Sequence, residues 1–112
     1  LEKLPIVAAA DILINATPVG MWPKANESLI PRHLLHNRLV VLDVVYNPKE
    51  TRLLTEAREK RCAIVYGYKM LLYQAAMQFE LFTGSKAPLD VMESVLTQAL
   101  EGETNATHFD RG

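Results

Sequence analysis

The chain has 112 residues, of which 49% are hydrophobic, and its formal net charge at pH 7 is -1. This length suits one small domain, and the hydrophobic content excludes a disordered chain because it supplies enough apolar surface for a core. The near-neutral charge argues against a nucleic-acid-binding protein, which needs a basic face. A single cysteine, Cys62, excludes a disulfide framework and favours a reducing, cytoplasmic location.

The N-terminus and the apolar runs also bear on location. The first residues are Leu-Glu-Lys-Leu-Pro, which lack the basic start of a secretory signal peptide. No run of 18 apolar residues occurs, so no transmembrane helix and no membrane partner are predicted. Because the sequence begins without Met, we expect a cut or partial chain.

Three short apolar segments are predicted to be buried parallel strands. The first is Ile12–Ile14, and the second and clearest is Leu39–Val45, which ends before Asn47-Pro48. The third lies in the segment Cys-Ala-Ile-Val-Tyr-Gly at 62–67. Continuous apolar runs of this length are typical of strands that are buried on both faces of a sheet.

Helices are predicted between and after these strands. Segment 50–61 reads as an amphipathic helix, 68–84 as a long helix capped by Gly84, and 87–102 as a helix with an apolar stripe. The proline-rich segment 18–31 is predicted to be a loop, followed by a short helical turn near 31–37. The polar tail 103–112 is expected to fray.

Strands that alternate with helices predict an α/β fold with a parallel sheet. About three strands are visible, so the chain is expected to be part of a doubly wound, Rossmann-like sheet followed by two C-terminal helices. The glycine-rich loop that would bind a dinucleotide phosphate is absent, since the five glycines are scattered. We expect residues 1–84 to be the C-terminal half of a Rossmann-like cofactor domain, 85–102 a C-terminal helix that would pack on a missing substrate domain, and 103–112 a polar tail.

Candidate site residues follow the three predicted strands. These are Thr17, Tyr46 and Gly67, and they are expected to share one edge because ligands of open α/β sheets bind beyond the carboxyl ends of the strands. Gln74 lies two helical turns after Gly67. Its amide offers a donor and an acceptor to a hydroxylated or carboxylated small molecule.

Each of these residues also has an ordinary structural interpretation, which stays open. An Asn-x-Thr-Pro segment alone is more often only a turn, and Tyr46 alone suits a half-buried packing tyrosine. Gly67 alone suits a tight strand-to-helix turn, and Gln74 suits a residue that ties down a loop. No group of histidines, cysteines and carboxylates has ligand spacing, so no metal is predicted.

Three stretches carry a more specific signal when they are taken together. They are DILINATPVGM at 11–21, VLDVVYNPKETRLLTEA at 41–57 and YGYKMLLYQAAMQFELFTG at 66–84. In this order and at this spacing they resemble the C-terminal, NADP-binding half of shikimate dehydrogenase, over roughly residues 4 to 100. The resemblance implies an oxidoreductase that reduces 3-dehydroshikimate to shikimate with NADPH, in aromatic amino acid biosynthesis.

The resemblance also implies the residues that line the cofactor. Asn15 and Thr17 belong to a turn that would form a floor for the nicotinamide, with Thr17 lining the nicotinamide and ribose pocket. Val44 would pack near the nicotinamide, the backbone of Gly67 would meet the carboxamide, and Met70 would pack against the ring.

The resemblance also implies that Tyr46 and Gln74 contact the substrate. No catalytic residue is predicted, because the family's catalytic Lys and Asp belong to an N-terminal substrate domain that this chain lacks. The chain alone is therefore expected to bind NADPH weakly and to catalyse nothing measurable. If it did turn over substrate, Asp43 and Lys69 would be the first candidates for a catalytic group.

Two alternatives and one partner remain open from the sequence. The first alternative is a paralogue that acts on quinate, or one of the aminoshikimate type, and the second is a non-catalytic module that needs another chain. The partner is a second copy of the chain, because the face that carries Leu89, Met92 and Leu96 is expected to be exposed without a substrate domain.

Overall fold

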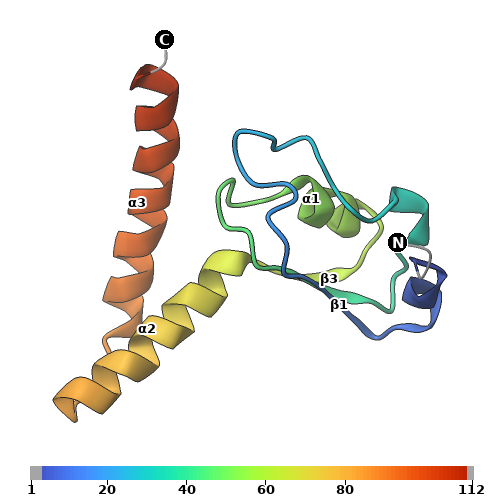
Figure 1. The fold of residues 1–112 in the computed structure, drawn as a ribbon. Helices are drawn as coiled ribbons and strands as arrows, with labels where there is room; N and C mark the ends of the chain where they lie inside the picture. Colours follow the sequence, from blue (N-terminus) through green and yellow to red (C-terminus); the bar gives the residue numbers. More distant parts are fainter. Residues whose placement is uncertain (1–3, 111–112) are drawn as a thin grey trace. The chain divides into compact units, whose positions relative to one another are not determined.

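A computed structural model describes residues 4–110 of the chain, with side chains described for residues 6–101 (Figure 1). The contacts divide the chain into two compact units, unit 1 up to Gly67 and unit 2 from Tyr68 onward. The predicted division at residues 84 and 102 concerns the arrangement in a longer protein and stays a prediction.

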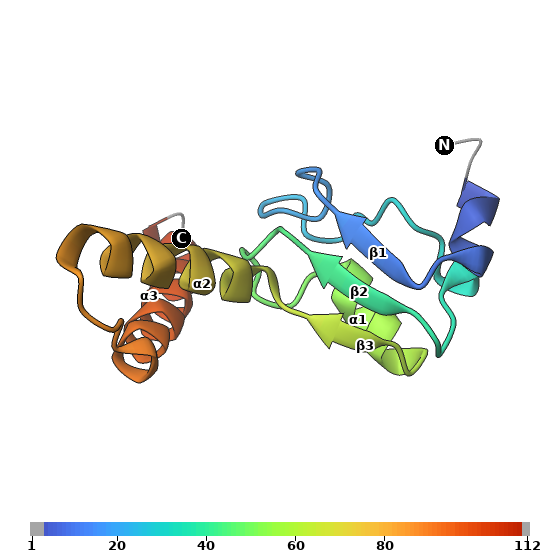
Figure 2. The ribbon, with the colours of Figure 1, turned by 90° about the horizontal axis from the view of Figure 1, so that it is seen from below.

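Unit 1 is built on a parallel sheet of three strands in the order β1-β2-β3 (Figure 2). The strands are β1 (Ile12–Asn15), β2 (Val40–Asp43) and β3 (Ala63–Val65). Ile12 pairs with Val40, and Val40 pairs with Ala63. The predicted parallel α/β architecture is confirmed, although β2 is shorter than the predicted 39–45.

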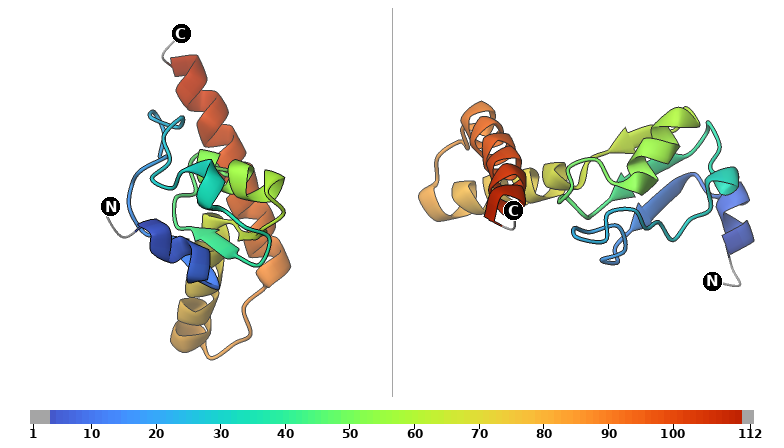
Figure 3. Two further views of the ribbon diagram at one scale, coloured as in Figure 1. Left: turned by 90° about the vertical axis from the view of Figure 1, so that its right-hand side faces the viewer. Right: turned by 90° about the horizontal axis from the view of Figure 1, so that it is seen from above.

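One helix and two 3₁₀ turns complete unit 1. The helix α1 (Arg52–Glu59) covers one face of the sheet (Figure 3), and the turns are η1 (Leu4–Ala9) and η2 (Arg32–Leu34). Thr51 is the N-cap of α1, since its hydroxyl accepts the Leu54 N–H, and it leaves Leu53 and Leu54 facing the sheet. The buried core contains Val7, Leu35, Leu39, Val41, Leu53, Leu54, Ala57 and Cys62.

The other face of the sheet is open, which makes the prediction of two buried faces wrong for the outer strands. Ile12 and Ile14 are 63% and 55% exposed, and Val65 of β3 is also exposed. The reason is that successive side chains of a strand point to opposite faces of the sheet. Leu13 therefore faces the core under α1, while Ile12 and Ile14 face away from it. Continuous apolar sequence indicates a strand suited to two covered faces, but the described residues cover only one.

Unit 2 consists of two helices joined by a short loop. The helix α2 (Gly67–Thr83) ends at Gly84, whose φ is +69° and whose N–H bonds Glu80 O at 2.9 Å, so the predicted cap is confirmed. The helix α3 spans Leu89–Asp110 and is longer than the predicted 87–102, because a single interior glycine weakens a helix without ending it. Tyr68 and Lys69 on α2 both donate to the Glu93 carboxylate on α3.

The apolar surface of unit 2 differs from the expected one. Leu89 is exposed as predicted, but Met92 and Leu96 are half-buried. Val91 and Val95 are further exposed large apolar side chains in the described part of α3. Along α2 a further apolar stripe is exposed at helical spacing, made of Met70, Tyr73, Met77 and Leu81. Among the described helices, none is long and apolar enough for a membrane span.

Cys62 is expected to react slowly with thiol reagents in the folded chain. It is 9% exposed, its Sγ donates to His36 O at 3.2 Å, and burial raises its pKa. Since the thiolate is the reactive form, labelling by Ellman's reagent at pH 8 should be at least roughly tenfold slower in buffer than in concentrated urea. Equal rates would show that this part of the core opens readily.

Candidate functional site

The carboxyl ends of the three parallel strands lie along one edge of unit 1. This edge is formed by Asn15, Asp43 and Val65, which end β1, β2 and β3. Thr17 and Tyr46 follow the first two ends and are exposed, so they are neither scattered to opposite edges nor sealed in the core. Such an edge is where open α/β sheets bind their ligands.

A buried carboxylate organises this edge. Asp43 is fully buried and accepts three hydrogen bonds, from the Asn15 amide at 3.0 Å, from the Val45 N–H at 3.0 Å and from the Thr51 hydroxyl at 2.6 Å. Thr51 also caps α1. Asp43 therefore connects the end of β1, the turn after β2 and the start of α1, and its burial leaves it no direct access to a ligand.

Asn15 uses its whole side chain inside the turn that follows β1. Its nitrogen donates to Asp43 and to Val19 O, and its oxygen accepts from the N–H and the hydroxyl of Thr17. Four hydrogen bonds exhaust a side-chain amide. Asn15 consequently shapes the predicted cofactor floor, while Thr17 is the residue of this pair that is exposed at the edge.

Gly67 is brought into close contact with the residues after β2. A Cβ atom at position 67 would lie 2.4 Å from Asp43 O, 2.6 Å from Val44 O and 2.7 Å from Val45 O. Only glycine fits against three backbone oxygens at these distances, which supports the tight-turn interpretation of Gly67. Val44 in turn donates its N–H to Asn15 O at 3.0 Å, so Asn15, Val44 and Gly67 are contiguous.

Met70 and Gln74 belong to unit 2, on the first half of α2. They lie one turn apart, and both are exposed. Lys69 beside them pairs with Glu93, and this hydrogen bond raises the pKa of Lys69, so its ammonium holds the proton more firmly than a free lysine does. That change is the opposite of what a neutral-pH proton donor needs.

The loop that carries Tyr46 is held by two further contacts. Asn47 O accepts the Trp22 N–H at 2.8 Å, which joins this loop to the segment after Gly20. Glu50 accepts from the hydroxyls of Thr55 and Tyr66 at 2.9 Å each and pairs with Arg58 at 2.7 Å. Because Tyr66 directly precedes Gly67, Glu50 ties the second strand end to the third.

This Glu50 cluster predicts a pH dependence of stability. The Arg58 hydrogen bond, with those of Thr55 and Tyr66, lowers the pKa of Glu50 from 4.5 despite partial burial. A lowered folded-state pKa contributes stability above pH 4.5 that is lost as the pH falls through the folded value. Urea denaturation from pH 6 to pH 3 should show a steeper loss for the parent chain than for Glu50→Gln, and parallel curves would contradict this assignment.

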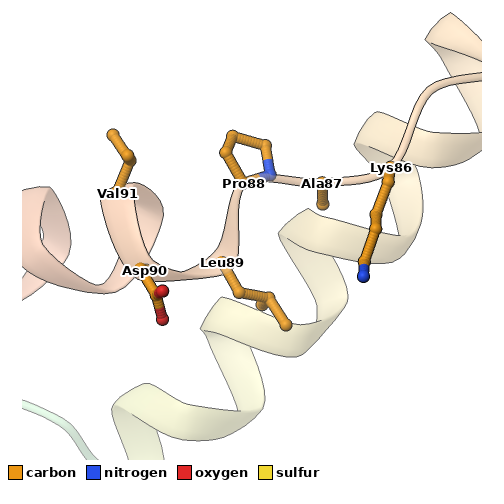
Figure 4. A pocket seen from close by; sticks show the side chains of 6 residues that line it. All are labelled: Lys86, Ala87, Pro88, Leu89, Asp90 and Val91. Carbon is orange, nitrogen blue, oxygen red and sulfur yellow. The ribbon is translucent and has the colours of Figure 1, made fainter.

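One hollow lies against this edge, and another lies in unit 2. One of about 100 Å³ lies beside the Asn15–Thr17 turn and is lined by Leu13, Ile14, Leu29, Ile30 and Leu53 in addition to that turn. The other, about 430 Å³, is in unit 2 and is lined by the single segment Lys86–Val91 (Figure 4). The polar side chains are Asn15 and Thr17 in the first hollow and Lys86 and Asp90 in the second. The described residues contain no group of metal ligands.

Thr51 was not predicted from the sequence, and Asp43 was predicted only as a candidate catalytic group in the event that the chain alone turned over substrate. The signal for Asp43 was a lone charge inside the apolar run Leu39–Val45, since a buried carboxylate must be hydrogen-bonded. The signal for Thr51 was its place directly before an amphipathic helix, where threonine is a preferred cap.

Comparison with known proteins agrees with this architecture. Residues 67–97 match the family model described as the Shikimate 5'-dehydrogenase C-terminal domain. A shikimate dehydrogenase (NADP(+)) of Methanobrevibacter smithii is 54% identical over 96 residues, which are 85% of this chain and 34% of that protein.

Solved structures show the same relation. The shikimate 5-dehydrogenase of Listeria monocytogenes, in complex with shikimate and NAD, has a TM-score of 0.79 and 41% identity over 85% of this chain and 34% of its own. The quinate dehydrogenase of Corynebacterium glutamicum, in complex with NAD, has a TM-score of 0.80 and 37% identity over 87% of this chain and 34% of its own. The chain belongs to the shikimate dehydrogenase family and spans about one third of the length of the relatives it matches.

Proposed function

We propose that this chain is part of an NADP-dependent shikimate dehydrogenase and forms one wall of its nicotinamide and substrate site. The observation that carries the proposal is the contiguous edge of Asn15, Val44 and Gly67 at the strand ends. These are positions that the family resemblance assigns to the cofactor. The relatives are named shikimate dehydrogenase (NADP(+)), and the family resemblance implies the reaction, the reduction of 3-dehydroshikimate to shikimate with NADPH.

The division of labour follows from the chemistry of hydride transfer. NADPH would supply the hydride for the reduction, and its nicotinamide must be held in contact with the substrate carbonyl carbon. In our proposal Thr17, Val44, Gly67 and Met70 orient the nicotinamide, while Tyr46 and Gln74 hydrogen-bond the substrate. The proton donor and the phosphate-binding loop come from the parts of the longer protein that correspond to the remaining two thirds of the relatives. We place the protein in the cytoplasm.

The exposed apolar surfaces support a role within a longer assembly. Ile12 and Ile14 leave one sheet face uncovered in unit 1, and Met77 and Leu81 are 67% and 81% exposed in unit 2. We propose that the remainder of the cofactor domain covers the open sheet face, and that the substrate domain or a second copy of the chain covers the helices. A surface of this kind is unusual for a protein that works alone.

Shikimate is favoured over quinate as the substrate. Eight curated relatives of 43–54% identity are named shikimate dehydrogenase (NADP(+)). Among the solved structures the quinate dehydrogenase, at 37% identity, lies within the range of the shikimate dehydrogenases, which is 28–41%, so the preference rests on the curated relatives.

A chimera tests the proposed function directly. Residues 4–100 would replace the corresponding third of the Methanobrevibacter smithii enzyme, and shikimate oxidation would be followed by the absorbance of NADPH. We expect turnover with NADP and shikimate, slower turnover with quinate, and none from the 112-residue chain alone. A folded chimera without turnover, or an isolated chain with turnover, would contradict the proposal.

The two glutamines of α2 provide a matched pair for the substrate contact. Gln74 and Gln78 lie one turn apart and are both exposed. In the chimera, Gln74→Leu should raise the KM for shikimate roughly tenfold through loss of a hydrogen bond to a ligand, while Gln78→Leu should change it less than about twofold. Equal effects of the two substitutions would remove Gln74 from the substrate site.

A further inference from the structure

A continuous set of hydrogen bonds runs from the buried Asp43 to the exposed Thr17 hydroxyl. Asp43 Oδ1 accepts from Asn15 Nδ2 at 3.0 Å, and Asn15 Oδ1 accepts from Thr17 Oγ1 at 2.6 Å and from Thr17 N at 3.2 Å. Asp43 is 0% exposed and Asn15 is 9% exposed, so water competes little for these groups. The residue that meets solvent is Thr17.

The partners of Asn15 allow only one orientation of its amide. Its nitrogen faces the Asp43 carboxylate and Val19 O, which only accept, and its oxygen faces the N–H of Thr17, which only donates. The Thr17 hydroxyl must therefore donate its single proton to Asn15 Oδ1. One lone pair of Thr17 Oγ1 accepts the Val19 N–H at 3.2 Å, and the other is left for a ligand.

We propose that Asp43 and Asn15 are positioning residues that hold the Thr17 hydroxyl as a hydrogen-bond acceptor for the bound cofactor. The proposal rests on the proposed function, because it takes the ligand at this edge to be NADP. A hydroxyl fixed in this way selects a donor on the ligand. The nicotinamide riboside half of NADP offers two, the carboxamide NH₂ and the ribose hydroxyls.

Substitutions at Thr17 in the chimera test the direction of this hydrogen bond. Thr17→Val keeps the shape and removes the acceptor, so the KM for NADP should rise about tenfold while kcat changes less than about threefold. Thr17→Ser should restore the parent KM. The matched control is Thr97→Val, since the Thr97 hydroxyl donates to Glu93 O within α3. A parent-like KM for Thr17→Val would overturn the proposal.

A double-mutant cycle tests whether Asn15 acts through Thr17. Asn15→Ala should raise the KM for NADP in the parent chimera but add nothing in the Thr17→Val background, whereas independent effects would multiply and would overturn the proposal. The acetylpyridine analogue of NADP, which lacks the carboxamide NH₂, separates the two donors. If it abolishes the effect of Thr17→Val the donor is the carboxamide, and if the effect persists the donor is a ribose hydroxyl.

An NMR measurement on the 112-residue chain tests the positioning without any activity. Three-bond couplings should show one χ1 rotamer for Thr17 in the parent and in Asp43→Asn, which keeps an acceptor oxygen, and an averaged rotamer in Asn15→Ala. An unchanged rotamer in Asn15→Ala would overturn the proposal even if the chimera is active. An inactive parent chimera with the expected couplings would instead count against the proposed function.

Discussion

Replacing Gly67 with alanine is expected to destabilise unit 1 by about 3 kcal/mol or more, because the added methyl group meets backbone atoms only. The added methyl group would lie 2.4–2.7 Å from three backbone oxygens, which belong to the last residue of β2 and the two residues that follow it. Backbone oxygens cannot rotate away as the end of a side chain would. Relief requires Gly67 and the end of β2 to separate. That movement would also disturb Asn15, which accepts the Val44 N–H.

The measurement is urea denaturation of the 112-residue chain followed by the fluorescence of Trp22, the single tryptophan, which is half-buried in unit 1. Gly84→Ala is the matched control. Gly84 has a φ of +69° and no atom within 4 Å of the position that an added methyl group would take, so this substitution strains the backbone by about 1 kcal/mol without a clash. A Gly67→Ala midpoint no lower than that of Gly84→Ala would show that the turn repacks.

The strand and helix pattern was predictable from local sequence because each element is marked at its own ends. The segment around Val40–Asp43 is apolar and β-branched, and Gly84 ends α2 where a left-handed residue is required. The candidate residues Thr17, Tyr46 and Gly67 were predictable for a related reason, since they follow strand ends and parallel strands end at one edge.

Exposure and side-chain partnerships were harder to predict, since both depend on residues distant in the sequence. Ile12 and Ile14 read as buried, but the face on which they lie has no cover within the described residues. Asn15 read as a ligand contact, yet its amide is used by residues 2, 4 and 28 positions away. A sequence pattern indicates that a side chain can hydrogen-bond, whereas the fold decides which partner it meets.

Removal of the Asp43 carboxylate is the second change expected to have a large effect. Asp43→Ala would leave three donors without their acceptor, namely the Asn15 amide, the Val45 N–H and the Thr51 hydroxyl. A buried donor left unsatisfied costs about 1–3 kcal/mol, and Thr51 is fully buried. We expect a loss of about 3–5 kcal/mol, which is comparable with the whole stability of a small domain, so unit 1 should lose its cooperative unfolding transition.

Asp43→Asn separates the hydrogen bonds from the bulk of the side chain. Its remaining oxygen can still accept from Asn15 and Val45, and its new NH₂ group can donate to Thr51, which also accepts the Leu54 N–H. The loss in this variant should be about 1 kcal/mol, measured by the same Trp22 denaturation. If Asp43→Ala unfolded at the same urea concentration as Asp43→Asn, solvent would be satisfying the three donors, and a carboxylate at this position would not be needed to join β1, β2 and α1. A transition that is kept in Asp43→Asn and lost in Asp43→Ala would therefore show how strongly one buried acceptor holds the ends of β1 and β2 to the start of α1.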